Sequence, residues 1–339
     1  MFIVNSYTLA VILCFVIMLC WGSWGNTQKL AAKSWRYELF YWDYVIGMVI
    51  FSLILAFTLG STGAEGQSFL ENLKQVSAEN IGWIIVGGII FNASNILLSA
   101  SISIAGMSVA FPLGVGIALV LGVINNYRVA LAQGAETGNV ALLASGVALV
   151  VVAIVCNGIA SGRKGGETSK EHQKKGIVLA LVAGVLMSFF SSFVMRAMDL
   201  TNFASPAPGT ATPYTAIVLF TLGVLLSNFV FNTLVMKKPF VGEPVNYSQY
   251  FKGNTKTHLV GMLGGAIWCL GTALSYISAG KAGAAVSYAL GQGAPMIAAI
   301  WGVFVWKEFK DSSKHVYGLL ALMFCFFVAG LGLIVAAGM

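Results

Sequence analysis

Acidic side chains within apolar segments are the first candidates for chemistry in this chain of 339 residues, of which only 9% are charged. Asp43 is the clearest of them, in the stretch FYWDYVIG that starts at Phe40. A carboxyl group held away from water can take up and release a proton, which is one interpretation of Asp43. The other is an acid near a membrane surface that reaches the lipid headgroups or pairs with Arg36 or Lys33.

Neutral polar side chains recur at helical spacing in two apolar segments, and their types suit hydrogen bonding to a polar solute. They are Asn92, Asn95, Ser99 and Ser103 in the first segment, and Trp268, Thr272 and Ser275 in the second. Each set places one polar stripe along one face of a helix. Two such stripes facing each other predict a hydrated cavity, and hydrogen bonds that only hold helices together are the alternative.

Glycine and proline interrupt two further apolar segments, as PLGVG from Pro112 and as GQGAP from Gly291. Such stretches either let helices approach closely or open a helix and expose its polar backbone groups to a ligand. Gln292 supplies an amide near the expected bilayer centre, and we expect it to hydrogen-bond a polar solute.

Two tryptophans three residues apart, Trp21 and Trp24, are expected on one face of the first apolar segment. Their indoles either belong to the aromatic belt near the membrane surface or stack on a planar or ring-shaped solute. The predicted proton-coupling residue is Asp43. The predicted substrate-binding residues are Trp21, Trp24, Asn92, Asn95, Trp268, Thr272 and Gln292.

Membrane spans must position these side chains. A helix needs about 20 mostly apolar residues to cross a bilayer, and 58% of this chain is hydrophobic. We predict an all-α integral membrane protein, in which ten spans leave no room for a separate soluble catalytic domain. The predicted spans are 6–25, 38–60, 80–104, 107–126, 137–160, 176–197, 212–235, 257–280, 283–306 and 315–337.

The basic residues are distributed unevenly over the predicted loops. Fifteen of the 19 lysines and arginines fall on one side and four on the other. Because loops rich in these residues stay in the cytoplasm, we expect a multi-pass protein of the cell (inner) membrane with both termini outside the cytoplasm. This distribution also accounts for the net charge of +7 without a nucleic-acid partner.

An internal repeat divides the chain at a constant offset of 177 residues. GGIIFN from Gly87 aligns with GGAIWC from Gly264, and Gly106 falls on Gly283 without a gap. Five spans in each half require the second half to enter the membrane in the opposite sense. We therefore predict two inverted five-helix repeats, 1–160 and 176–339, joined by a cytoplasmic linker, 161–175. Inverted repeats are typical of secondary transporters, which alternate access to a midplane site.

An intramembrane enzyme is the rival class, but His172, His258 and His315 lie in loops or at span ends. Neither a His-Glu-x-x-His nor a Gly-x-Ser-x-Gly motif occurs, and the five cysteines lack metal-ligand spacing. We expect no catalytic residue, metal or cofactor. The expected partners are the lipid bilayer, a small-molecule substrate and a proton. The oligomeric state is left open, and a monomer is compatible with these features.

Several motifs resemble those of the ureide permease family, ten-span carriers of the drug/metabolite transporter superfamily. They are WGSWG from Trp21, YWDY from Tyr41, the glycine-rich fourth span and WGVFVWKEF from Trp301. The resemblance covers nearly the whole chain. It implies import of nucleobase-like heterocycles such as allantoin and uracil by proton symport, and it favours Asp43 as the coupling residue.

One departure from the family concerns nucleotide binding. Plant members carry a nucleotide-loop-like motif in the central loop, whereas GIASGRKG from Gly158 lacks the required spacing. We therefore expect no ATP binding here. Related bacterial carriers of the superfamily resemble importers of rhamnose, glucose or ribose, so proton-coupled import of a monosaccharide is the alternative function.

Overall fold

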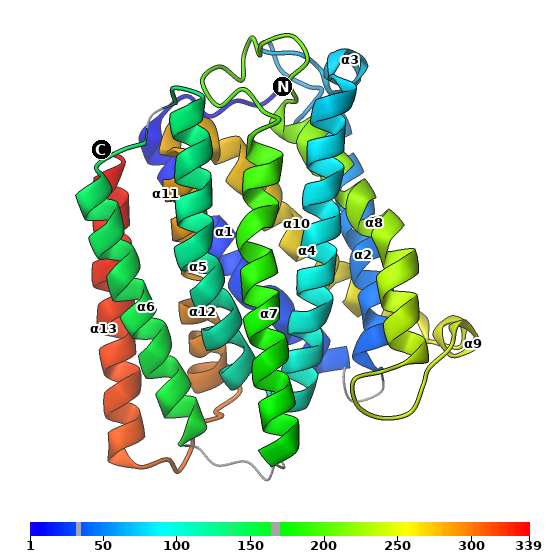
Figure 1. Cartoon of the computed structure of the whole chain (residues 1–339), viewed down its shortest axis with the longest axis vertical. Coiled ribbons are helices and arrows are strands. Elements are labelled where there is room, and N and C mark those ends of the chain that lie inside the picture. Colours follow the sequence, from blue (N-terminus) through cyan, green and yellow to red (C-terminus); the bar gives the residue numbers. More distant parts are fainter. Residues whose placement is uncertain (32–34, 136, 164–169) are drawn as a thin grey trace.

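The protein is a bundle of long helices that stand roughly parallel, with both termini at the same end (Figure 1). The computed structural model describes residues 1–31, 35–135, 137–163 and 170–339, without the side chains of 107–109, 111, 112 and 170. Lys33, one predicted partner of Asp43, and residues 164–169 of the predicted linker lie outside the described residues. The helices of the first half are α1 (Tyr7–Ala31), α2 (Tyr37–Phe57), α3 (Phe69–Gln75), α4 (Ala78–Ala105), α5 (Met107–Ala132) and α6 (Val140–Gly162). Those of the second half are α7 (Lys170–Met195), α8 (Pro213–Lys237), α9 (Tyr247–Phe251), α10 (Thr255–Ala282), α11 (Ala284–Gly291), α12 (Ala294–Ile300), the π-helix η1 (Trp301–Val305) and α13 (Lys314–Ala337).

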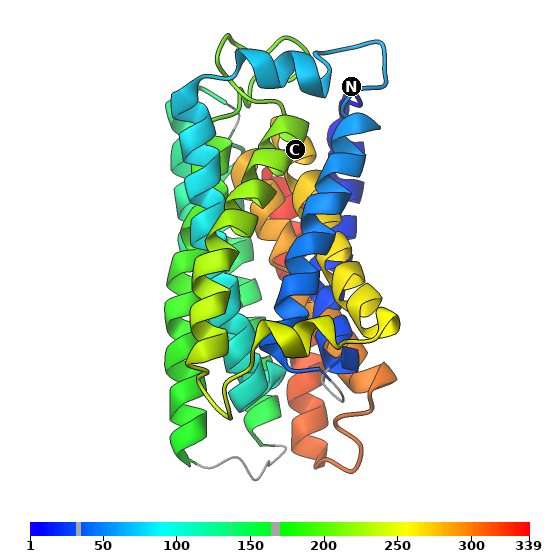
Figure 2. The same cartoon turned by 90° about the vertical axis from the view of Figure 1, so that its right-hand side faces the viewer.

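Ten helical segments in the described part are long and apolar enough to cross a membrane, which confirms the predicted all-α membrane fold with ten spans. Most predicted boundaries agree within three residues, but α1 and α5 end six residues later than expected and α7 begins six residues earlier. In α1 the reason is that packing hides polar residues from water. The first span was expected to end at residue 25, but α1 continues to Ala31. Asn26, Thr27 and Gln28 are buried in its last turns, so their low hydropathy does not mark an end. The short helices α3 and α9, at opposite ends of the bundle, were not predicted (Figure 2).

Two equivalent helices, one in each half, begin and end at positions that match the predicted repeat. α10 begins and ends 177 residues after α4, and each of the two helices ends at a glycine, Gly106 or Gly283. The φ angles of these glycines are 83° and 80°, a backbone conformation that favours glycine at a turn between two helices. α1 packs on α10, and α7, its counterpart by order in the second half, packs on α4. The inverted repeat stays a prediction, and these correspondences support it.

The two glycine- and proline-rich segments differ in the structure. In the second half the helix is interrupted, because α11 ends at Gly291 and α12 starts at Ala294, with Pro295 in its first turn. In the first half α5 runs without a break from Met107 to Ala132. There Gly114 serves close packing instead: a Cβ added to Gly184 of α7 would lie only 2.5 Å from the carbonyl oxygen of Gly114.

Candidate functional site

A cavity inside the bundle brings together most of the predicted substrate-binding residues. It has an empty volume of about 430 Å³, which includes open surroundings. Its walls come from α1, α4, α5, α7 and α10 and from the interruption between α11 and α12. The lining residues are Trp21, Trp24, Phe91, Asn95, Leu98, Val115, Met187, Phe190, Trp268, Gln292 and Ala294.

One wall of the cavity is a cluster of aromatic rings centred on Trp268. The Trp21 and Trp268 rings stack with centroids 6.2 Å apart and an interplanar angle of 15°. Phe91 approaches Trp268 to 4.1 Å between centroids, and Phe220 stacks on it at 6.0 Å. Trp21 is held further by its indole N–H, which donates to the Thr272 hydroxyl at 3.2 Å. These contacts orient large flat side chains before any ligand binds, which lowers the entropy cost of binding.

Four polar groups on the cavity wall remain available for a solute. Gln292 is only 4% exposed, yet its side-chain amide has no hydrogen-bond partner among the described residues. The same holds, within the described part of the chain, for the indole N–H groups of Trp24 and Trp268 and for the amide oxygen of Asn95. Donors and acceptors without partners thus gather at one cavity, and together they could hydrogen-bond a ligand that carries both kinds of group.

The interrupted helix brings Gln292 to the cavity, and glycines let α1 approach it. A Cβ on Gly291 would lie 2.7 Å from the Trp21 ring, and one on Gly293 would lie 2.5 Å from the sulfur of Met18. Both distances are too short for any side chain larger than hydrogen. The GQGAP segment therefore does both things expected of it: it opens the helix, and it allows close packing against α1.

Two of the predicted residues do not line this cavity. Asn92 is fully buried and donates a hydrogen bond of 2.9 Å to the Ser227 hydroxyl of α8. Thr272 is also buried, and its hydroxyl accepts from Trp21 and donates to the carbonyl oxygen of Trp268. Asn92 therefore links two helices, and Thr272 orients the aromatic wall. Ser103, at the end of the same predicted stripe, is exposed.

Asp43 lies outside the cavity, in a separate cluster between α2, α9 and α10. It is fully buried, and its carboxylate accepts from the Tyr250 hydroxyl at 2.6 Å and from the Trp35 indole at 3.2 Å. The His258 Nδ1 lies 2.7 Å from the same oxygen that Tyr250 contacts. Burial, followed by the hydrogen bond to Asp43, raises the pKa of Tyr250. In this arrangement Asp43 is buried and does not pair with Arg36, and Lys33, the other partner expected for it, lies outside the described residues.

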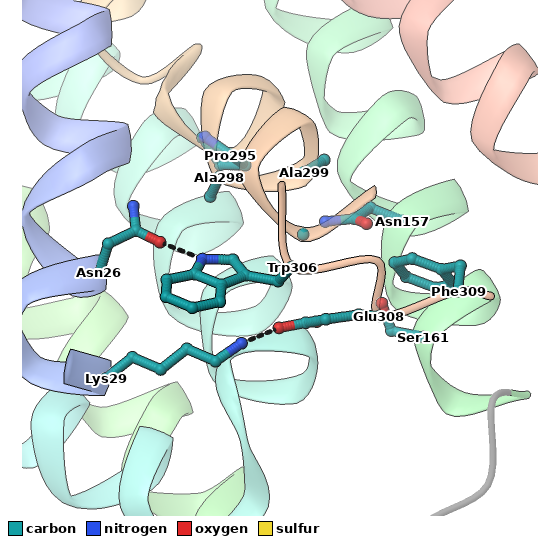
Figure 3. Close-up of a pocket in the computed structure, with 11 residues that line it drawn as sticks. Asn26, Lys29, Asn157, Ser161, Pro295, Ala298, Ala299, Trp306, Glu308 and Phe309 are labelled. Carbon is teal, nitrogen blue, oxygen red and sulfur yellow. Dashed lines mark hydrogen bonds and ion pairs between the residues drawn. The ribbon is translucent and has the colours of Figure 1, made fainter. Parts of the chain in front are cut away.

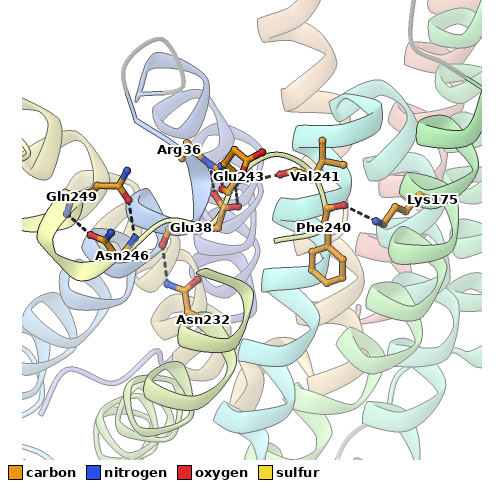
Figure 4. A network of polar contacts seen from close by, with 9 residues as sticks. All are labelled: Arg36, Glu38, Lys175, Asn232, Phe240, Val241, Glu243, Asn246 and Gln249. Atoms are coloured by element: carbon orange, nitrogen blue, oxygen red, sulfur yellow. Dashed lines mark hydrogen bonds and ion pairs between the residues drawn. The ribbon is translucent and has the colours of Figure 1, made fainter. Parts of the chain in front are cut away.

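The segment that brings Tyr250 to Asp43 is held by a second polar network (Figure 4). Arg36 forms an ion pair with the buried carboxylate of Glu38 and donates to the backbone carbonyl groups of Val241 and Glu243. Asn232 of α8 donates to the carbonyl oxygen of Glu38 at 2.8 Å. Arg36 is thus the partner of Glu38, and it fixes the loop between α8 and α9 against the start of α2.

Helix α2 connects the Asp43 cluster with the cavity. Tyr41, two residues before Asp43, is fully buried and accepts a hydrogen bond of 3.2 Å from the Asn95 amide, which lines the cavity. On its other side α2 packs so closely on α10 that a Cβ on Gly261 would lie 2.4 Å from the Cβ of Asp43. A shift of α2 at Asp43 would therefore also move Tyr41 and its hydrogen bond to the cavity residue Asn95.

The sequence alone did not identify His258, Tyr250 or Trp35 as partners of Asp43. His258 was placed correctly at a span end, but it lies 215 residues from Asp43 in the chain. Tyr250 belongs to the unpredicted helix α9. The ring contacts of His258, at 4.9 Å from Tyr250 and 5.3 Å from Trp35, show that the three form one unit around the carboxylate.

A second, more polar cavity opens where α1 ends, between α1, α6 and α12 (Figure 3). Lys29 pairs with Glu308 across it and lies 4.5 Å from the centre of the Trp306 ring. The Trp306 indole donates to Asn26 at 2.7 Å. These contacts connect the end of α1 with the segment after η1 and close this end of the bundle. Among the described residues, no three His, Cys, Asp or Glu side chains gather as metal ligands would.

Comparisons with known proteins agree with this architecture. A family model described as "Ureide permease" matches residues 40–175 and 163–337. Ureide permease 1 and ureide permease 2 of Arabidopsis thaliana are each 22% identical to the chain, and each alignment covers 99% of both proteins. A solved structure described as "Crystal structure of protein" has a TM-score of 0.57 at 16% identity over 96% of both chains, which shows a shared fold. The chain therefore belongs to the ureide permease family, a family of membrane transporters and not of enzymes.

Proposed function

We propose that the protein is a secondary active transporter that imports a small, planar, polar solute of the ureide or nucleobase class by alternating access. The observation that carries this proposal is one cavity that combines an aromatic wall with four polar groups that lack partners among the described residues. Several relatives bear the name ureide permease, which agrees with a solute of this class.

The chemistry of the cavity suits a flat heterocycle better than an apolar compound. Flat rings stack on indole and phenyl faces such as those of Trp24 and Phe91. The indole N–H groups can donate to ring carbonyl groups, the Asn95 oxygen can accept from ring N–H groups, and the Gln292 amide can do both. A solute lacking these groups would leave buried polar atoms unpaired, which costs about 1–3 kcal/mol for each one.

The two halves, 1–160 and 176–339, are proposed to rock against each other around this cavity. The matched boundaries of α4 and α10 and the exchange of packing partners between the halves support this mechanism. We place the protein in the inner membrane with both termini outside the cytoplasm, because the basic residues gather at the opposite end. The polar cavity closed by Lys29 and Glu308 then lies on the cytoplasmic side.

Asp43 is proposed as the proton-coupling residue. Its carboxylate is fully buried, yet it lies 2.7 Å from the ring of His258, whose side chain is 20% exposed and so offers a contact with water. Protonation would weaken the hydrogen bonds that the carboxylate accepts from Tyr250 and Trp35 and would change its contact with His258, and thereby weaken the link from α2 to α9 and α10. Because Tyr41 of α2 contacts Asn95, this loosening reaches the cavity.

Uptake into proteoliposomes tests both parts of the proposal. We expect labelled allantoin or uracil to accumulate when the interior is made alkaline, and an uncoupler to abolish the accumulation. Accumulation of ribose instead would favour the monosaccharide alternative, and no accumulation of any of these solutes would refute the symporter.

Asp43→Asn should abolish pH-driven accumulation while solute exchange across the membrane without a pH gradient continues. Asp311→Asn is the matched control, because Asp311 is an exposed loop acid with φ of 66°, a conformation that asparagine tolerates. Accumulation by the Asp43 variant equal to that of the control would show that Asp43 does not couple the proton. A tag on the N-terminus that is labelled only after cells are permeabilised would contradict the proposed orientation.

A further inference from the structure

A groove on the outer surface of the bundle, between the last turns of α5 and α7, carries two arginines. The two helices stand side by side (Figure 1) and end at the same face as both termini. The groove encloses an empty volume of about 1020 Å³, which includes open surroundings. Its lining residues are Asn125, Arg128, Val129, Ala132, Gln133, Phe189, Ser192, Phe193 and Arg196. We call it the Arg128–Arg196 groove.

Both guanidinium groups in the groove lack an acidic partner. Arg128 and Arg196 are exposed, and no carboxylate of the described residues lies within 4.0 Å of either. Two of the described acids at this end of the bundle are engaged elsewhere: Glu79 accepts from the Trp83 indole, and Asp199 accepts hydrogen bonds within its own loop. Lys74, Arg128, Arg196 and Lys281 are the only four basic residues predicted on this side. Two of these four, from different helices, therefore meet at one groove.

The other polar groups of the groove already have partners within the protein. Gln133 donates to the last carbonyl groups of α7, those of Met195 and Arg196, at 3.3 and 3.4 Å. Asn125 donates to the carbonyl oxygen of Ser188 at 3.1 Å. These bonds matter because the free carbonyl groups at a helix C-terminus repel anions. With the end of α7 capped, the positive charge of the two arginines dominates the groove.

The position of the groove selects a lipid and not a dissolved ion. Val129, Ala132, Phe189 and Phe193 give it an apolar wall on the outer surface of the bundle, where we expect the hydrocarbon of the membrane. Arg196 lies 4.6 Å from the centre of the Trp83 ring, and tryptophans are enriched at the depth of the lipid headgroups. A phosphate between the arginines would thus continue into acyl chains along the apolar wall.

We propose that the Arg128–Arg196 groove binds the phosphate of an anionic phospholipid, with one guanidinium group on each side of it and an acyl chain along Val129 and Phe189. Guanidinium groups suit this role because they bind phosphate through two parallel hydrogen bonds. A bound lipid would hold together the ends of α5 and α7, which belong to different proposed halves of the transporter.

Native mass spectrometry of the full chain in detergent tests this proposal. The protein is titrated with phosphatidylglycerol and with phosphatidylcholine of the same acyl chains. We expect phosphatidylglycerol to bind more tightly, and Arg128→Gln/Arg196→Gln to weaken its binding by at least about tenfold, the effect of one lost charge-assisted hydrogen bond. Lys74→Gln/Lys281→Gln is the matched control, because it removes the same charge from the same side of the protein.

Several outcomes would overturn the proposal. Unchanged phosphatidylglycerol binding in the double arginine variant would show that the arginines only extend to the membrane surface. An equal loss in the lysine control would indicate general attraction of anions and no site. Suppression of phosphatidylglycerol binding by the same concentration of inorganic phosphate would indicate a dissolved anion as the ligand. Should the double variant elute as an aggregate, the single variants Arg128→Gln and Arg196→Gln are each expected to weaken binding.

Discussion

Replacing Gln292 by alanine tests whether the cavity is a binding site, because the structure separates the effects on binding and on folding. The Gln292 amide lines the cavity and has no hydrogen-bond partner among the described residues. Gln292→Ala therefore removes no known hydrogen bond of the protein, and we expect the free energy of unfolding to change by less than about 1 kcal/mol. Binding of the solute should lose about 1–2 kcal/mol, or roughly 5- to 30-fold in affinity, because a desolvated polar group of the solute loses its partner.

Asn92→Ala is the matched control, since it removes the same amide from a different setting. Asn92 is fully buried, and its amide donates to Ser227 between α4 and α8. We expect this variant to lower the free energy of unfolding by about 1–3 kcal/mol and to leave the affinity nearly unchanged. Equilibrium binding of labelled uracil and allantoin to the purified proteins, together with their thermal unfolding, measures both quantities.

The two variants should thus show opposite patterns. Normal affinity in Gln292→Ala for every solute that the wild-type protein binds would refute the assignment of the cavity as the substrate site. A loss of stability in Gln292→Ala as large as that in Asn92→Ala would show that the amide supports packing. Reduced affinity in Asn92→Ala without reduced stability would instead restore Asn92 to the substrate site.

Three further predictions follow from contacts outside the cavity. Gly265→Ala should prevent folding or lower the yield of folded protein severely, because the added Cβ would lie 1.8 Å from the carbonyl oxygen of Tyr44. The yield of detergent-extracted protein on size exclusion measures this effect, and a normal yield would contradict the packing of α2 on α10. Partial burial alone would raise the pKa of Asp199, but hydrogen bonds led by that of the Thr201 hydroxyl outweigh it and hold the pKa below its ordinary value. The stability that Asp199 adds is therefore present above the unfolded-state pKa and lost as the pH falls through the folded-state pKa. The difference in unfolding temperature between wild type and Asp199→Asn should therefore shrink as the pH falls below about 4, and a constant difference would refute this. Lys29→Met should lower the free energy of unfolding by less than about 1 kcal/mol, because the ion pair of Lys29 with Glu308 is about one-third exposed. A larger loss in thermal unfolding would show that this ion pair contributes more to stability than an exposed pair does.

Local patterns in the sequence were sufficient for the fold. Ten apolar segments of span length predicted the ten spans, because hydropathy depends on composition and not on the arrangement of the helices. The glycines at 106 and 283, which the repeat matched, lie at two turns between helices, where glycine adopts the required positive φ without strain. The interruption at Gln292 was one of two outcomes expected for a segment rich in glycine and proline, and the unbroken α5 shows that these residues alone do not decide between them.

Which polar side chain faces the cavity was decided by the tertiary structure. Asn92 and Asn95 lie on the same predicted stripe, but the Asn92 amide donates to Ser227 of α8 and the Asn95 amide to Tyr41 of α2, and of the two only Asn95 lines the cavity. Whether such a side chain faces the cavity or a neighbouring helix depends on how the helix is rotated about its axis. The side chains of the neighbouring helices set that rotation, and the periodicity of a single segment carries no information about them.

The partners of Asp43 likewise could not be predicted from the sequence. The sequence identified the acid, because a charged residue in an apolar segment is rare and costly. Its partners Trp35, Tyr250 and His258 come from a loop, a five-residue helix and the start of another span. Hydropathy and spacing describe each segment by itself, whereas a hydrogen bond over 215 residues depends on how whole helices pack. The sequence by itself therefore determined the spans and the candidate acid, and the packing of α2 against α9 and α10 determined the chemistry available to that acid.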